Sequence, residues 1–229
     1  MKAGIIATVE EETDEIESFE EEILLPDHEV YSSIKQCVQI RETIELADNR
    51  VAQVGRAAVD EISTSEKADI ENGEIRVTEK PEMVTKYTEF LLVQGSFIAA
   101  SSSSGRFVFD LISTHTGSEI TPVEFDLNGF IEDRESADPW KVGFENRTGN
   151  AENGVVHGEE LLRDGELGNA LNNSKKNQIG LEYNSDGHLL KVFVTKSGYV
   201  EVYQPSNYDS REFIKFIESD LLHNVSNNN

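Results

Sequence analysis

The chain has 229 residues, of which 44 are acidic and 20 are basic, so its formal net charge at pH 7 is −24. A surface this acidic repels other polyanions over most of its area and keeps the protein soluble. Hydrophobic residues make up 37% of the chain, which is enough to bury a core, and the single cysteine, Cys37, excludes an internal disulfide bond. No stretch has the roughly 18 apolar residues that a membrane helix needs, so we expect a soluble, cytoplasmic protein without membrane contact.

Two physical situations favour so acidic a surface. At molar salt the Debye length falls to roughly 3 Å, and repulsion among carboxylates is screened. Alternatively, the charge imitates a polyanion or attracts basic partners. The composition resembles that of haloarchaeal proteins, and we interpret it as salt adaptation.

The N-terminal part is predicted to be acidic and partly helical. Eleven acids lie between residues 10 and 29, and Ile16, Phe19 and Ile23 stand at helical spacing before Pro26. A disordered acidic arm is the alternative for this segment, because dense like charge disfavours order.

A second helix is predicted over residues 40–62. Apolar side chains recur there at steps of four and three residues, which is typical of a helix. The even-numbered apolar residues from Val30 to Leu46 would instead suit a long strand. The polar stretch 63–73 ends this segment, and we place a boundary at residue 80, between an acidic N-terminal region (1–80) and a sheet domain (81–229).

The C-terminal part is predicted to be a mainly antiparallel sheet. Short β-rich runs alternate with turn residues, and the last three runs form a meander. A short helix is predicted over 126–135. The predicted strands are 73–78, 88–100, 106–112, 140–144, 154–161, 178–183, 189–195 and 199–203.

A closing helix over 209–223 has the clearest local signature. Asp209 is a good N-cap, Glu212 completes a capping box, and Phe213, Phe216 and Leu221 line one face. This helix is expected to cover the meander. The predicted class is therefore α+β, with an acidic helical N-terminal part and a mainly antiparallel C-terminal sheet covered by a C-terminal helix.

No motif in the chain specifies catalysis, and we predict no catalytic residue, metal ligand or cofactor. Clustered carboxylates are what a divalent metal uses, and Asp126, Glu132, Asp133 and Asp138 crowd one segment. One residue in five is acidic, however, so we interpret this segment as a solvated face. His157 stands near Glu159, and we interpret it as a histidine on a sheet surface.

Charge is unevenly distributed along the chain, and this suggests one candidate site. Residues 1–60 contain 15 acids and 5 bases, whereas residues 140–203 contain 9 acids and 7 bases. Lysines and aromatic groups gathered on one side of the C-terminal sheet would form an anion- or nucleic-acid-binding face. The alternative is an ordinary charged rim. The candidate residues are Trp140, Lys141, Arg147, Lys175, Lys176, Lys191 and Lys196, with Tyr183 and Tyr199 as further stacking groups.

These patterns favour a non-catalytic interaction module that binds a protein partner through the sheet or its covering helices. The first alternative is a nucleic-acid-associated accessory protein that uses the basic and aromatic face. The second is a metal-dependent hydrolase or nuclease that uses the carboxylates of 126–138.

Overall fold

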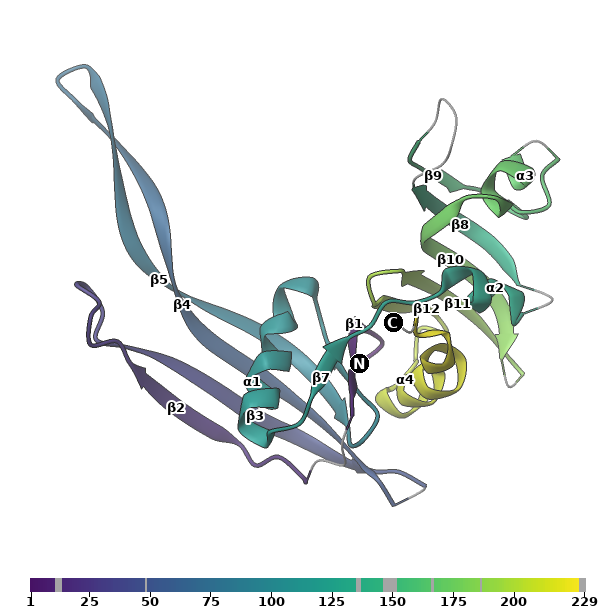
Figure 1. Cartoon of the computed structure of the whole chain (residues 1–229), viewed down its shortest axis with the longest axis horizontal. Coiled ribbons are helices and arrows are strands. Elements are labelled where there is room, and N and C mark those ends of the chain that lie inside the picture. Colours follow the sequence, from purple (N-terminus) through teal and green to yellow (C-terminus); the bar gives the residue numbers. More distant parts are fainter. Residues whose placement is uncertain are drawn as a thin grey trace.

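One continuous antiparallel sheet forms most of the molecule (Figure 1). The computed structural model describes residues 1–10, 14–47, 49–134, 137–145, 152–165, 167–185 and 187–226, with the main chain alone at 138. The strand order is β2-β3-β4-β5-β6-β1-β12-β11-β10-β8-β9, and β7 pairs with β1. The strands are β1 (Ala3–Val9), β2 (Phe19–Leu24), β3 (Ser33–Glu45), β4 (Val51–Glu71), β5 (Glu74–Val93), β6 (Phe97–Ala100), β7 (Ile120–Pro122), β8 (Asp138–Glu145), β9 (Gly154–His157), β10 (Lys175–Ser185), β11 (His188–Thr195) and β12 (Tyr199–Gln204).

The helices are short and none of those described is both long and apolar enough to cross a membrane. A 3-10 turn precedes the first helix, and a π-helical turn followed by a 3-10 turn extends the last one. The helical segments are η1 (Ser103–Arg106), α1 (Phe107–Thr116), α2 (Leu127–Glu132), α3 (Leu167–Asn172), α4 (Ser210–Phe216), η2 (Ile217–Leu221) and η3 (Leu222–Asn224).

The predicted helical N-terminal part is wrong, because the described residues before η1 form strands and turns without a helix. The segment predicted as a helix over 40–62 is the end of β3, a turn and the start of β4. Asn49 in this turn has a φ of 66°, a left-handed conformation that asparagine tolerates better than most residues. The turn therefore interrupts an apolar spacing that matched a helix by coincidence, and the even-numbered alternation was the better guide.

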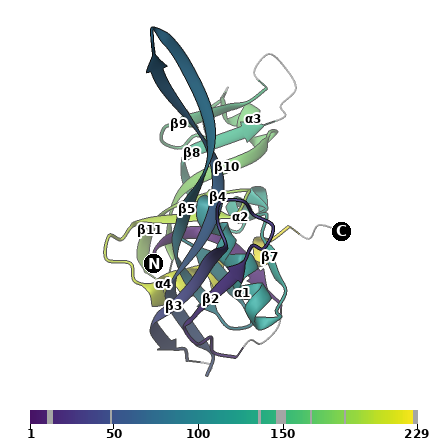
Figure 2. The ribbon, with the colours of Figure 1, turned by 90° about the vertical axis from the view of Figure 1, so that its left-hand side faces the viewer.

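β4 and β5 form one long hairpin that projects from the body of the molecule (Figures 1 and 2). Asn72 and Gly73 have φ values of 52° and 83°, and Glu71 pairs with Glu74. Two positive φ angles in a two-residue connection are typical of a type I′ turn, for which Asn-Gly is the preferred pair. The polar stretch 63–73 is therefore part of this hairpin. β5 also runs through residue 80, where the sequence analysis placed a boundary.

One further predicted strand is a helix in the structure, whereas the predicted C-terminal elements match it. The run 106–112, predicted as a strand, is α1 with the end of η1. Its β-branched and aromatic side chains are buried against the sheet at helical spacing, so packing overrides strand propensity. The C-terminal meander is confirmed as β10, β11 and β12, and the capping box of Asp209 and Glu212 begins α4 as predicted.

The two halves of the sheet have the same order of elements on either side of β1. In each half a three-stranded meander ends on β1 and is followed by a helix: β4-β5-β6 then α1, and β10-β11-β12 then α4. Both β6 and β12 run antiparallel to β1. α1 and α4 lie on opposite faces of the sheet, because α1 packs in one cluster with Ile5 and α4 packs in the other with Ile6.

The core consists of two clusters, one on each face. Ile6, Val192 and Phe216 belong to the cluster under α4 and α2, and Ile5 and Val108 belong to the cluster under α1. Because the core residues of β10, β11 and β12 all face α4, the other face of the C-terminal half has no described helix over it.

Candidate interaction face

The uncovered side of the C-terminal sheet carries a row of aromatic and charged side chains, which we call the open face. Along β11, Val192 and Val194 are buried under α4, so the intervening Lys191 and Phe193 lie on the opposite side. The same alternation places every second residue of β12 on that side. The open face consists of Trp140, Lys141, Gly180, Glu182, Lys191, Phe193, Tyr199, Glu201 and Tyr203.

A β-bulge brings Trp140 onto this face. Gly180 of β10 pairs with Lys141, but Leu181 pairs with Pro139, so Trp140 is the extra residue in β8. A bulge re-aims a side chain in this way. The indole ring lies directly against Gly180, where any Cβ atom would overlap it. The indole Nε1 is buried and has no hydrogen-bond acceptor among the described residues.

The aromatic rings form two contacting pairs, each with a lysine above it. Trp140 and Tyr203 meet edge to face with ring centroids 5.7 Å apart, and Phe193 and Tyr199 lie 6.3 Å apart. Lys191 Nζ lies 5.1 Å from the centre of the Trp140 ring. Lys141 Nζ lies 4.1 Å from that of Phe193. At these distances each ammonium group is attracted to the face of the ring beneath it.

The charges of the open face are balanced. Lys191 Nζ lies 3.5 Å from a carboxylate oxygen of Glu182, and the Tyr199 hydroxyl donates a 3.2 Å hydrogen bond to Glu201. Burial, with Glu201 nearby, raises the pKa of Tyr199 to about 12 and also raises the pKa of Tyr203. Both phenols are therefore neutral hydrogen-bonding groups at neutral pH, and the face has no excess of positive charge.

The predicted site residues divide into two groups. Trp140, Lys141 and Lys191 lie together on the open face. Lys176 instead points to the α2 side of the sheet, where its Nζ donates a 2.7 Å hydrogen bond to Asn128 Oδ1. Lys175 and Lys196 lie near it, Tyr183 is buried in the core under α4, and Arg147 lies outside the described residues.

The second group of lysines lines a cavity of about 240 Å³ beside α2. Burial lowers the pKa of Lys176, while Glu132 and Asp126 oppose that shift. Lys196 Nζ lies 3.9 Å from Glu124 and 3.7 Å from Glu145. Since acids surround these lysines, the cavity does not form a positive patch.

The acidic segment 126–138 serves local structure where it is described. Asp126 caps α2 by accepting a 3.0 Å hydrogen bond from the Asn128 N–H. Asp133 Oδ2 lies 2.9 Å from His223 Nε2, and this contact with a second one from Asn224 holds the Asp133 pKa below its usual value. Within the described residues no three His, Cys, Asp or Glu side chains come together as a metal site would require, and the Asp138 side chain is outside them.

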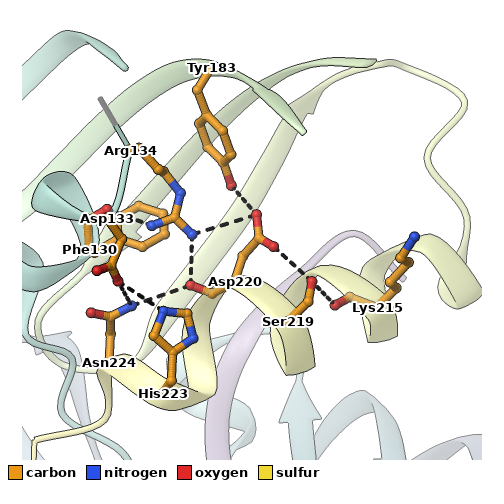
Figure 3. A network of polar contacts seen from close by, with 9 residues as sticks. All are labelled: Phe130, Asp133, Arg134, Tyr183, Lys215, Ser219, Asp220, His223 and Asn224. Atoms are coloured by element: carbon orange, nitrogen blue, oxygen red, sulfur yellow. Dashed lines mark hydrogen bonds and ion pairs between the residues drawn. The ribbon is translucent and has the colours of Figure 1, made fainter. Parts of the chain in front are cut away.

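A partly buried polar network joins the turn after α2, β10 and η2 (Figure 3). Arg134 lies over the rings of Phe130 and Tyr183 and donates hydrogen bonds to two backbone carbonyls. Asp220 accepts hydrogen bonds from Tyr183 and Ser219, at 2.7 Å each. Burial raises the pKa of the Tyr183 phenol, and Asp220 reinforces the shift. These contacts fasten η2, the continuation of α4, to β10 and to the turn after α2.

Sequence reasoning missed Phe193, Tyr203 and the two glutamates of the open face. The signal was present in the alternation of β11 and β12, where valines occupy every second position. This alternation shows which residues share a side of the meander. Which side is exposed follows only from the position of α4 on the other side.

Comparison of the chain with family models, with curated proteins and with solved structures gives no match. The assignment of the open face therefore depends on its own geometry and chemistry.

Proposed function

We propose that this chain is a non-catalytic binding module of a salt-adapted cytoplasmic protein, and that it binds a protein partner on the open face. The observation that supports this is the half-exposed aromatic row on a sheet face that no described helix covers. Tryptophan and tyrosine are the residues that most often dominate protein interfaces, because one end of each is apolar and the other makes hydrogen bonds.

The charge of the face favours a protein over a nucleic acid. Binding to single-stranded nucleic acid combines stacking rings with a positively charged groove. Here Lys141 and Lys191 are matched by Glu182 and Glu201, and the other predicted lysines lie elsewhere. A nucleic-acid-binding accessory protein remains the second candidate, on the strength of the two lysines held over aromatic rings.

The test compares what co-purifies from the native host, at native salt, with the wild type and with Tyr203→Ala. We expect a stoichiometric protein partner whose co-purification is unaffected by nuclease treatment. Truncation of an aromatic side chain that dominates an interface costs about 2 kcal/mol or more, so the variant should bind the partner about 30-fold more weakly. Because the Tyr203 side chain is 43% exposed, the variant should stay folded and lose only the edge-to-face contact with Trp140, about 0.5–1.5 kcal/mol of stability.

Ile23→Ala is the matched control, because Ile23 on β2 is 41% exposed and Tyr203 is 43% exposed. The control should bind the partner as the wild type does. Equal capture by all three proteins would contradict the assignment of the open face. Capture that nuclease abolishes would replace the protein partner with a nucleic acid.

A further inference from the structure

The end of the β4–β5 hairpin, residues 61–84, is a two-stranded arm with two unlike faces. The pairing register places Ile70 opposite Ile75 and Ala68 opposite Val77 on one face. This face is highly exposed: Ile70 by 81%, Ile75 by 73% and Val77 by 57%. We call it the apolar arm face. Its residues are Ile62, Thr64, Glu66, Ala68, Ile70, Ile75, Val77, Glu79, Pro81 and Met83.

The only charged residues of this face are two glutamates that stand opposite each other. Glu66 pairs directly with Glu79 in the register, and like charges at directly opposed positions destabilise a strand pair. The three bases of the arm, Lys67, Arg76 and Lys80, all alternate onto the other face. No ion pair is formed by either glutamate within the described residues, which include the whole arm.

The arm is fixed where it leaves the body. The Tyr31 hydroxyl accepts a 3.1 Å hydrogen bond from the Met83 N–H and lies 3.3 Å from the Pro81 carbonyl oxygen, to which it donates. Beyond this point only one strand pair holds the arm together, and a two-stranded hairpin alone is marginally stable in water. A binding partner that buries the apolar side chains and neutralises the two opposed carboxylates would therefore stabilise the arm.

We infer that the apolar arm face binds an apolar segment of another protein that carries a lysine or arginine at its centre. The cation would lie between Glu66 and Glu79, and apolar side chains would cover Ala68 and Val77 on one side and Pro81 on the other. Same-face positions on a strand are roughly 7 Å apart, so the matching segment is extended, with apolar residues two and four positions from the cation.

A second copy of this chain is disfavoured as the occupant. Each copy carries a net charge of −24, and the apolar arm face contributes no base. Packing two such faces together would bring four carboxylates near one another without a counter-charge, and like charges brought together at an interface strongly oppose association.

The test uses two nine-residue peptides with valine at alternate positions and serine between, one with arginine and one with glutamate at its centre. Binding to the full-length protein is measured at the lowest KCl concentration at which the protein stays folded. We expect the arginine peptide to bind about tenfold more tightly or better, because only it neutralises the glutamates. It should also slow amide hydrogen exchange in residues 61–84.

Two variants with the same charge change locate the effect. Glu79→Lys places a lysine opposite Glu66 and should reduce the preference for the arginine peptide to about twofold or less. Glu82→Lys alters the other face and should preserve the preference. Without peptide, Glu79→Lys should slow exchange in the arm, because it replaces a repulsive pair with an attractive one.

The inference is overturned if neither peptide binds at millimolar concentration, if both bind equally, or if the two variants behave alike. Faster exchange in Glu79→Lys than in the wild type also overturns it. Analytical ultracentrifugation tests whether a second copy of this chain binds the apolar arm face. If the wild type is a dimer and Ile75→Glu is a monomer, the occupant is another molecule of this chain and the inference is overturned.

Discussion

At the scale of single residues, the position of Trp140 depends on two neighbours in β8 and β10. Simple alternation would place it with Val142 and Phe144, on the side under α4. The bulge between Pro139 and Lys141 turns it to the open face, and Gly180 leaves room for the indole ring there. The central residue of the candidate interface therefore depends on a glycine that makes no side-chain contact.

Gly180→Ala should displace Trp140 from the sheet, because the new methyl group overlaps the indole ring. Trp140 is the only tryptophan in the chain, so its fluorescence emission reports the displacement directly and should shift to longer wavelength. We also expect a loss of about 1–3 kcal/mol in the free energy of unfolding, the usual range for overpacking.

Gly165→Ala is the control for this prediction, because a Cβ atom at Gly165 meets no other atom within 4 Å. Its emission spectrum should match the wild type. An unchanged spectrum in Gly180→Ala would mean that the ring does not lie against that glycine.

At the scale of elements, α4 and η2 stabilise the face of the sheet opposite to the open face. Phe213, Phe216, Ile217 and Leu221 are buried in the cluster under α4. Arg50 reaches from the start of β4 to Glu218 with two hydrogen bonds of 2.7 and 3.1 Å. The closing helix therefore spans both halves of the sheet.

Phe216→Ala should lower the free energy of unfolding by about 3 kcal/mol, the usual range for deletion of a buried aromatic side chain. Chemical denaturation monitored by circular dichroism measures it. Lys215→Ala, at the neighbouring position, is the comparison and should have a much smaller effect because Lys215 is exposed. Equal stability of Phe216→Ala and the wild type would mean that the helix does not pack on the sheet.

Local signals predicted α4 and the C-terminal meander but not the N-terminal half. A capping box and a short turn each specify structure within a few residues, so both are visible in the sequence. Asn72-Gly73, between Ile70 and Ile75, is an equally local hairpin signal. It was missed because 63–73 was interpreted as a polar stretch that ends the helix predicted over 40–62. α1 could not be predicted locally, since Val108, Phe109 and Ile112 have high strand propensity. Their helical conformation depends on packing against the sheet, which the local sequence does not show.

The candidate site was predictable only in part. Alternation along straight strands brings Lys141 and Lys191 together. A register shift between Lys176 and Gln178 breaks that alternation, and Lys176 turns toward α2. Such irregularities depend on the pairing partner, which a single sequence does not specify.

At the scale of the whole molecule, the acidic residues lie where solvent reaches them. Among the described residues, none of the fully buried polar side chains is an aspartate or a glutamate. The net charge of −24 is therefore spread over the surface, where mobile ions can screen it. Self-repulsion of this kind opposes the compact state.

Raising KCl from ~0.1 M to ~2 M should raise the melting temperature, because screening removes repulsion among carboxylates in the folded state. Differential scanning calorimetry at several KCl concentrations measures the effect, which should be steepest at low salt. A melting temperature that is flat or falls would contradict salt adaptation and would favour polyanion mimicry as the reason for the acidic surface.

The place of β1 between β6 and β12 affects how the protein is made. β1 is translated before the other strands of the sheet, and β6 and α1 follow about 90 residues later, long before β12, so one edge of β1 can be paired while the C-terminal strands are still to be made. The other edge, at Ala3–Ile5, pairs only with β12, which begins at Tyr199. A nascent chain therefore carries an open strand edge from the synthesis of β1 until β12 has left the ribosome. Its high negative charge helps to keep neighbouring nascent chains apart during that time.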